Sequence, residues 1–129
     1  LHIMVQKEVA DRMTSTENKK TYGRLSIAIQ ARCKVEKLFN ISPNAFFPKP
    51  KITSSFIRIT PKNNLDEDVL DTLDSIIKDA FSKRRKKITN GLINYFSKEE
   101  ILKMDIDCES RPENLTVENY IKVSKKRCS

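Results

Sequence analysis

A stiff loop at residues 44–51 brings aromatic rings next to ammonium groups. Phe46 and Phe47 lie beside Lys49 and Lys51, and the two prolines of the loop restrict its conformations. Stacking on an aromatic ring is worth about 1–3 kcal/mol per nucleobase, and a nearby ammonium group can hold a phosphate. The loop could therefore grip a flipped base. A hairpin loop whose Phe side chains fill the core is the plainer alternative.

A second candidate is a run of five consecutive cations, Lys83-Arg84-Arg85-Lys86-Lys87. If the run continues a helix, its side chains spread around the axis, so about three could contact one phosphate backbone together. The run also follows an acidic helical segment at 65–81, whose C-terminal end would favour cations without any ligand. Phosphate binding and helix stabilisation both remain open.

No constellation for acid-base or nucleophilic catalysis is visible. Glu8 is the only plausible acid-base residue, and it lacks a partner in the sequence. The single histidine and three scattered cysteines indicate neither a His-paired nucleophile nor a zinc site with close ligand spacing. We therefore predict no metal site, and the unpatterned thiols favour a reducing, intracellular compartment.

Glycine is scarce, which excludes whole classes of nucleotide site. Only Gly23 and Gly91 are present, whereas the glycine-rich loops that hold ATP or NAD need several closely spaced glycines. A self-contained site of those kinds is excluded.

Charge favours a polyanionic partner. The 129 residues hold 25 Lys and Arg against 17 Asp and Glu, a net charge of +8. Residues 49–64 and 82–96 contain four and five basic residues with no acidic one. The longest apolar run is far shorter than the roughly 20 residues of a membrane span, so we expect no membrane partner.

The first half of the chain predicts a mixed α and β unit. Helices are expected at 6–13 and 22–33, the second with Leu25, Ile29 and Cys33 on one face.

Two short segments rich in branched and aromatic residues, 35–39 and 54–60, predict strands that pair as antiparallel neighbours. Residues 3–5 resemble a strand already in progress, and the chain begins with Leu rather than Met. We therefore expect a piece of a larger protein.

From about residue 62 the pattern is helical. Asp66 is expected to cap one helix, Ser97 with Glu100 to form a capping box, and Thr116 to start the last helix. The expected apolar positions are Val69, Leu73, Ile76, Ile77, Ala80, Phe81, Ile88, Leu92, Tyr95 and Phe96. The sequence thus predicts a mixed unit at 1–61 and a helical unit at 62–129.

Five motifs occur in one order along the chain. They are Gln6-Lys7-Glu8-Val9-Ala10-x-Arg12, Tyr22-Gly23-Arg24-Leu25-Ser26, Phe46-x-Pro48-x-Pro50-Lys51-Ile52-x-Ser54, Phe81-x-x-Arg84-Arg85-Lys86-x-Ile88-x-Asn90-x-Leu92 and Arg111-x-Glu113-Asn114-Leu115-Thr116-Val117-Glu118. In this order and spacing they resemble the C-terminal half of the ribosomal RNA adenine dimethyltransferases of the bacterial KsgA type. The resemblance extends from the first residues to about Ile121.

The resemblance implies a fold that is α/β followed by all-α. Residues 1–61 would be the C-terminal portion of a Rossmann-like, S-adenosylmethionine-dependent methyltransferase domain, and 62–129 a small helical domain that contacts rRNA. The family's glycine-rich cofactor loop, acidic ribose-binding residue and Asn-Leu-Pro-Tyr catalytic motif would all precede Leu1. We therefore expect the parent protein to bind S-adenosylmethionine, and no catalytic or cofactor-binding residue in this chain.

The resemblance also implies residue roles. Phe46 would pack against the extruded adenine, whereas Phe47 occupies a variable family position. The expected RNA-binding residues are Lys49, Lys51, Lys83, Arg84, Arg85, Lys86 and Lys87.

The implied function is dimethylation of two adjacent adenosines of small-subunit rRNA during ribosome biogenesis in the cytoplasm. Its partners would be small-subunit rRNA and the immature small ribosomal subunit, with the protein a monomer and the isolated fragment inactive. One alternative is a non-catalytic, basic RNA-binding or ribosome-assembly module. The other is a large-subunit rRNA adenine methyltransferase that confers antibiotic resistance.

Overall fold

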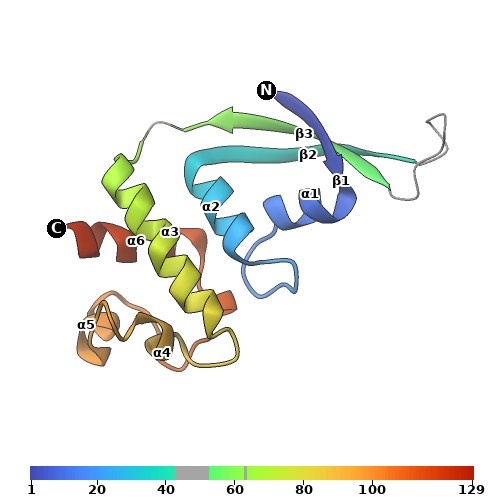
Figure 1. Cartoon of the computed structure of the whole chain (residues 1–129). Helices are drawn as coiled ribbons and strands as arrows, with labels where there is room; N and C mark the ends of the chain where they lie inside the picture. Colours follow the sequence, from blue (N-terminus) through green and yellow to red (C-terminus); the bar gives the residue numbers. More distant parts are fainter. Residues whose placement is uncertain (43–52, 63) are drawn as a thin grey trace.

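A small antiparallel sheet and two groups of helices make up the molecule (Figure 1). In this computed structural model, the structure describes residues 1–42, 53–62 and 64–129. In chain order the elements are β1 (His2–Gln6), α1 (Lys7–Met13), α2 (Arg24–Arg32), β2 (Cys33–Ile41), β3 (Ser54–Pro61), α3 (Glu67–Ser82), α4 (Ile88–Leu92), α5 (Lys98–Lys103), the 3-10 turn η2 (Pro112–Asn114) and α6 (Val117–Cys128).

The sheet has the strand order β1-β3-β2, and both pairings are antiparallel. The predicted antiparallel pair is confirmed as β2 and β3, and the strand at residues 3–5 is confirmed as β1. On β3, Ser55, Ile57 and Ile59 are buried while Arg58 is exposed, the alternation of a sheet covered on one face.

A small core joins that covered face to α1. Ala10 and Met13 of the helix pack with Ile57 and Ile59 of β3, all of them at least nine-tenths buried. The helix holds this position because its apolar residues recur at intervals of three and four. The sheet and α1 therefore form one layer against another.

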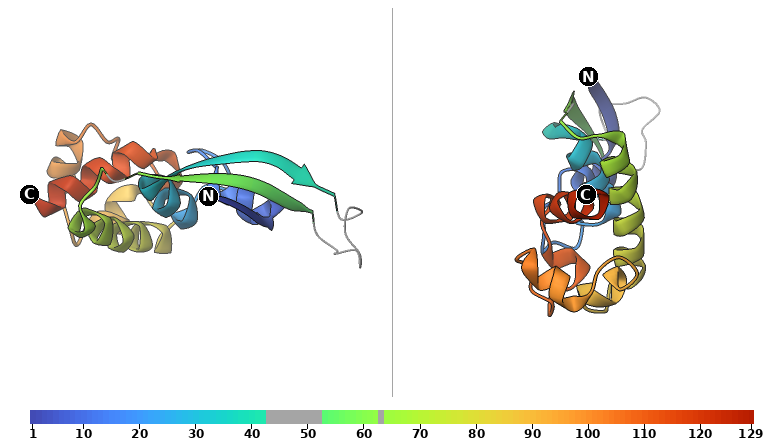
Figure 2. Two further views of the ribbon diagram at one scale, coloured as in Figure 1. Left: turned by 90° about the horizontal axis from the view of Figure 1, so that it is seen from above. Right: turned by 90° about the vertical axis from the view of Figure 1, so that its left-hand side faces the viewer.

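A larger core fills the helical unit. Residues of α3, α4, α5 and α6 surround Leu73, Ile76, Leu92 and Val123, which are fully buried. Figure 2 shows this helical end on one side and the β2–β3 pair reaching away from it on the other. Nine of the ten predicted apolar positions are confirmed as members of this core, with the Phe81 and Tyr95 side chains only partly buried. Val69, the tenth, is buried but is not part of this core.

Helix α2 lies between the two cores, and its predicted apolar face is wrong in part. Ile27 and Ala31 point into the large core, whereas Ile29 and Cys33 pack against the small one. Leu25 is 43% exposed. A helix that packs against apolar partners on two sides has no single buried stripe. A prediction from fourfold spacing alone therefore assigns the wrong residues to the buried face. The division between units at residue 61 stays a prediction, because α2 contributes to the core of the helical unit.

The expected helix starts lie where predicted. Ser97 Oγ accepts from the Glu100 amide at 3.2 Å, and Thr116 Oγ1 accepts from the Asn119 amide at 3.0 Å. Asp66 occupies the N-cap position of α3, but its side chain makes no capping hydrogen bond. The carboxylate there still favours the helix through the positive end of its dipole.

Candidate nucleic-acid interface

The cationic run forms a turn between α3 and α4, which corrects the expectation that it continues a helix. Lys83 ends α3 with φ −118° and ψ 46°, and the Lys86 amide donates to the Lys83 carbonyl at 2.9 Å. We call residues 83–87 the basic turn. In a turn the five side chains leave in different directions, so each has its own surroundings.

Arg84 is held by three groups of the protein. Its Nη2 donates to the Tyr22 carbonyl at 3.0 Å, and its guanidinium carbon lies 5.6 Å from the centre of the Phe81 ring. Its Nε lies 4.0 Å from Oε2 of Glu113, an oxygen that is buried and has no hydrogen-bond partner among the described residues. Arg84 thus connects the loop before α2 to the helical unit.

Lys83 and Lys87 at the ends of the turn also have protein partners. The Lys83 ammonium group donates to the Asn90 carbonyl at 3.4 Å, and that of Lys87 lies 2.5 Å from the Glu109 carboxylate. Both side chains are exposed, so these contacts are weak and leave the charges accessible.

Arg85 and Lys86 are the free cations of the turn. Both are exposed, and among the described residues neither side chain makes a hydrogen bond or an ion pair. They line a shallow hollow of about 410 Å³ together with Lys83 and Arg84. Unpaired cations around a hollow are suited to an anionic ligand such as a phosphate.

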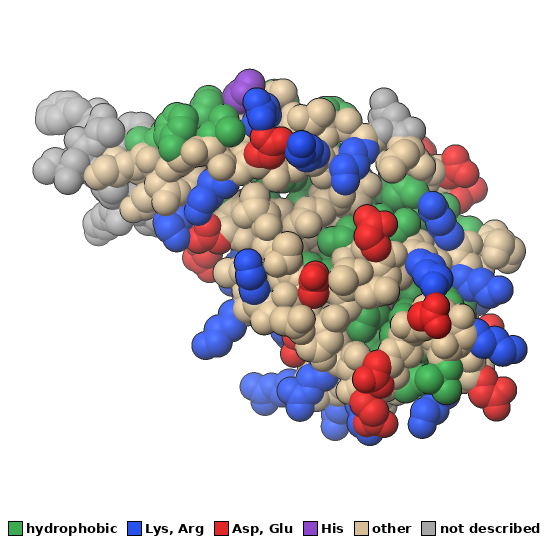
Figure 3. Space-filling model, turned by 180° about the vertical axis from the view of Figure 1, so that it is seen from behind, with side chains coloured by type: hydrophobic (Ala, Val, Ile, Leu, Met, Phe, Trp, Pro, Cys, Tyr) green, Lys and Arg blue, Asp and Glu red, His purple; other side chains and the backbone are tan. Residues whose placement is uncertain are grey.

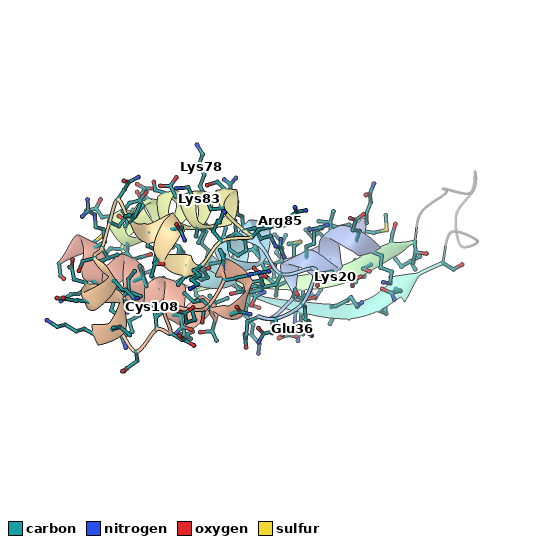
Figure 4. All side chains as sticks on the ribbon, turned by 90° about the horizontal axis from the view of Figure 1, so that it is seen from below. Lys20, Glu36, Lys78, Lys83, Arg85 and Cys108 are labelled. Carbon is teal, nitrogen blue, oxygen red and sulfur yellow. The ribbon has the colours of Figure 1, made fainter. Side chains whose placement is uncertain are left out.

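A neighbouring loop adds two lysines that the sequence pattern does not single out. Lys19 and Lys20 are exposed and shortly precede Tyr22, the residue that Arg84 contacts. Seen from below, Lys83, Arg85 and Lys20 follow one another along the molecule (Figure 4). In the sequence, the only sign of these two residues as binding residues is that they are adjacent lysines in a polar loop. The tertiary structure is needed to show that this loop lies next to the basic turn.

The 14–23 loop is fastened to the helical unit at further points. The Asn18 amide donates to the Glu113 carbonyl at 2.8 Å, and Asn114 Nδ2 donates to Asn18 Oδ1 at 2.8 Å. Asn18 adopts a φ of 70°, a conformation in which Asn is tolerated better than most residues. These contacts fix Lys19 and Lys20 relative to the basic turn.

Two buried tyrosines support the same junction. The Tyr22 hydroxyl donates to the Leu115 carbonyl at 2.8 Å, and the Tyr120 hydroxyl donates to the Pro112 carbonyl at 2.5 Å. Burial raises the pKa of both tyrosines above its ordinary value, and nearby Glu17 adds to the rise at Tyr22. Both side chains therefore act as neutral hydrogen-bond donors.

Three of the predicted site residues, Phe46, Lys49 and Lys51, lie outside the described residues. Glu8, the one acid-base candidate, pairs with Arg12 at 3.3 Å on the surface of α1. Within the described ranges, no three His, Cys, Asp or Glu side chains are grouped as a metal ion would require. None of the helices described is both long and apolar enough to cross a membrane.

The chain matches the family model of the ribosomal RNA adenine dimethylases over residues 1–127. It is 40% identical over 127 residues to the ribosomal RNA small subunit methyltransferase A of Legionella pneumophila (strain Corby), covering 97% of this chain and 50% of that protein. The protein of the same name from Buchnera aphidicola is 43% identical over 126 residues, covering 96% and 46%. The chain thus spans about half the length of the curated relatives it matches.

Two solved structures share the fold. A dimethyladenosine transferase from Plasmodium falciparum superposes with a TM-score of 0.79 at 27% identity, covering 98% of this chain and 57% of that one. The 23S rRNA methyltransferase ErmE superposes with a TM-score of 0.75 at 15% identity, over 99% and 54%, which shows the fold alone. The sheet and helices are therefore those of part of a methyltransferase fold, and the family match over almost every residue shows that this chain belongs to the ribosomal RNA adenine dimethylase family.

Proposed function

We propose that this chain is the C-terminal half of an S-adenosylmethionine-dependent rRNA adenine dimethyltransferase. Residues 1–61 would end its Rossmann-like domain, and residues 62–129 would form its helical RNA-contacting domain. The observation that carries the proposal is the match to the family model over residues 1–127, combined with relatives about twice as long. The isolated half would be inactive.

The proposed substrate is a pair of adjacent adenosines in small-subunit rRNA, each dimethylated on an immature small ribosomal subunit in the cytoplasm. The curated relatives are named as small-subunit methyltransferases, which favours this substrate over large-subunit rRNA. The likeness to the 23S enzyme is one of fold. We propose a monomeric enzyme.

S-adenosylmethionine would supply the methyl group, and the described residues do not fit a site for it. Gly91 is used in packing, whereas Gly23 has room for a side chain. A Cβ on Gly91 would lie 2.7 Å from Cα of Ala80, and a Cβ on Gly23 would lie 3.8 Å from the Arg84 guanidinium. Gly91 therefore lines no open cradle of backbone amides, and Gly23 has no further glycine near it in the sequence, unlike the glycines of phosphate- or cofactor-binding loops. We propose that residues outside this chain hold the cofactor.

The basic turn would hold the RNA backbone. The side chains of Arg85 and Lys86 have no partner in the described part of the chain and would bind phosphate directly. Lys83 and Lys87 would add charge, and Arg84 would orient the turn while its exposed edge faces the RNA. Contacts of this kind position an RNA without reading its sequence.

Phe46 would stack on the extruded adenine, with Lys49 and Lys51 beside the flanking phosphates. The adenine amine is a poor nucleophile because its lone pair is delocalised into the ring. Stacking does not change that, but it fixes the ring at the distance and angle that methyl transfer needs. This chain would contribute one face of the base pocket and part of the RNA grip.

The full-length protein tests the proposal through methyl transfer to immature small subunits. Phe46→Ala should lower kcat/KM by about 5- to 150-fold, the loss expected from 1–3 kcal/mol of stacking. Phe47→Ala is the matched control and should change it by far less. Equal rates for wild type and Phe46→Ala would remove the assigned role of Phe46, and a larger effect of Phe47→Ala would move it to the other ring.

The non-catalytic alternative makes a different prediction. A ribosome-assembly module of the same fold would bind small-subunit rRNA with a similar salt dependence but transfer no methyl group. Absence of methyl transfer by the full-length protein, with RNA binding retained, would decide for that alternative.

A further inference from the structure

A second basic hollow lies between α5 and α6, away from the basic turn. It measures about 580 Å³. The side chains that matter for its chemistry are Lys103, Lys122, Lys125, Lys126, Glu100 and Met104. We call it the lysine hollow.

The spacing of the lysines explains why they converge. Lys122, Lys125 and Lys126 lie three and four residues apart, so they share one face of α6. Lys103 is the last residue of α5 and meets them from the other side of the hollow. Figure 3 shows lysine and arginine side chains spread over the helical end of the molecule, with acidic side chains between them.

Three of these four cations are free among the described residues. Lys122 donates to the Met104 carbonyl at 3.1 Å and lies 3.8 Å from Asp105. The ammonium groups of Lys103, Lys125 and Lys126 make no hydrogen bond or ion pair in the part of the chain that the structure describes. Like charges that converge with too few counterions repel one another, and a bound anion would relieve that cost.

The acidic group in the hollow is already engaged. Glu100 Oε1 accepts from the Ser97 amide at 3.1 Å within the capping box of α5. These hydrogen bonds with Ser97, and the charges of Lys126 and Lys103, hold its pKa below the ordinary value. Glu100 and Asp105 together do not neutralise four lysines, so the hollow stays positive.

Stabilisation of helix ends does not account for the whole arrangement. Cations in the last turn of α5 and α6 are favoured by the helix dipole, but this effect acts on each helix separately. Here cations from two helices face one hollow, beside the buried Met104. Apolar walls raise the field that such a group of charges exerts on an anion.

The end of α6 that lines the hollow packs against the first half of α3, whereas the basic turn follows the last residue of α3. Cys128, at the end of α6, lies 3.3 Å from Thr72 and 3.6 Å from the Asp68 carbonyl, in the first half of α3. At 1.5 Å per residue along α3, the end of α6 lies about 20 Å from the basic turn, too far for neighbouring phosphates of one strand.

We infer that the lysine hollow binds the phosphodiester backbone of a second segment of the folded rRNA, while the basic turn holds the first. The inference rests on the proposed function, because it takes rRNA as the partner. Two contacts about 20 Å apart would fix the orientation of the enzyme on a structured RNA, which one contact cannot do.

Binding of the full-length protein to a small-subunit rRNA transcript, measured between 50 and 200 mM salt, tests this inference. The triple variant K103Q/K125Q/K126Q should bind more weakly. The slope of log K against log salt should fall by about 0.9 for each duplex phosphate that the variant no longer neutralises, with affinity near tenfold lower per phosphate at 0.1 M salt. K103R/K125R/K126R keeps the charge and should bind as the wild type does.

A control triple, K34Q/K62Q/K98Q, removes the same charge from positions outside the hollow and the basic turn. Equal slopes for the two Gln triples would overturn the inference, because the effect would then be one of net charge. Urea unfolding checks that each variant folds. R85Q/K86Q separates the two proposals: if it weakens binding while the hollow triple matches its control, the second site fails and the proposed function stands.

Hydroxyl-radical footprinting supplies the decisive readout. The wild type should protect two separate segments of the rRNA, and K103Q/K125Q/K126Q should lose one and keep the other. Persistence of both protected segments in the triple variant would overturn the inference.

Discussion

The guanidinium of Arg84 donates a hydrogen bond to the main-chain carbonyl of Tyr22 at 3.0 Å, across 62 positions of sequence. This contact joins the loop before α2 to the end of α3. Arg84, the second cation of the basic turn, is thus a structural member of the fold, whereas its neighbour Arg85 is exposed and its side chain has no partner among the described residues. Adjacent residues of the same type therefore have different tasks.

Removal of Arg84 should destabilise the protein more than removal of Arg85. Arg84→Ala removes a charge-assisted hydrogen bond and leaves Glu113 Oε2 buried without its cation, so we expect a decrease of about 1–3 kcal/mol in the free energy of unfolding. Arg85→Ala should change it by less than about 0.5 kcal/mol. Urea unfolding of both variants measures the difference. Equal decreases would show that the contacts of Arg84 do not stabilise the folded protein.

The free cations should dominate the salt dependence of RNA binding. Arg85→Gln with Lys86→Gln should lower the slope of log K against log salt by up to about 0.9 for each duplex phosphate left without its cation, because every neutralised phosphate releases counterions. Binding should weaken similarly for all RNA sequences. Fluorescence anisotropy over a salt series measures the slope. An unchanged slope would show that Arg85 and Lys86 do not contact phosphate in the complex with RNA.

Gly91→Ala should destabilise the protein although alanine is the better helix former. Alanine gains about 1 kcal/mol in helix propensity over glycine. At this position, however, its Cβ would lie 2.7 Å from Cα of Ala80 on α3, a backbone atom that cannot move aside alone. We expect a net decrease of about 1–3 kcal/mol in the free energy of unfolding.

Gly23→Ala is the matched control for that variant. Its Cβ would lie 3.8 Å from the Arg84 guanidinium, an ordinary contact, and its φ of −170° suits any residue. Because Gly23 is the N-cap of α2, where glycine is preferred to alanine, the change should cost up to about 1 kcal/mol and less than Gly91→Ala. A Gly91→Ala protein with a higher Tm than wild type would show that α3 and α4 do not approach each other so closely.

Stability should fall at alkaline pH because of the two buried tyrosines. The pKa of Tyr22 and of Tyr120 is raised in the folded protein by burial, above the value of about 10 in the unfolded chain. A raised pKa contributes stability that is complete below pH 10 and is lost as the pH rises toward the folded-state pKa. Urea unfolding between about pH 8.5 and 11 should show this decline.

Tyr22→Phe is the variant that identifies the cause. At neutral pH it should cost about 1 kcal/mol, because the Leu115 carbonyl loses its donor. Above pH 10 the decline should be shallower than in the wild type, since one group no longer ionises on unfolding. Parallel curves for variant and wild type would assign the alkaline decline to other groups.

Local signals predict the structure correctly where they act within a few residues. The capping box at Ser97, the helix start at Thr116 and the stripe around Leu73 and Ile76 are predictable because a helix end and a helix face depend on neighbouring positions. The spacing that begins at Leu25 misleads for the opposite reason. Which side of α2 is buried depends on two cores built from distant parts of the chain.

The sequence by itself determined the family, the order of strands and helices, and the concentration of positive charge at residues 83–87. Tertiary structure alone decided which cations are free, because hydrogen-bond partners such as the Tyr22 carbonyl lie far away along the chain. It also brought together the lysines of α5 and α6. Burial and pairing depend on contacts between segments that are distant in the sequence, so they cannot be predicted from the pattern of neighbouring residues.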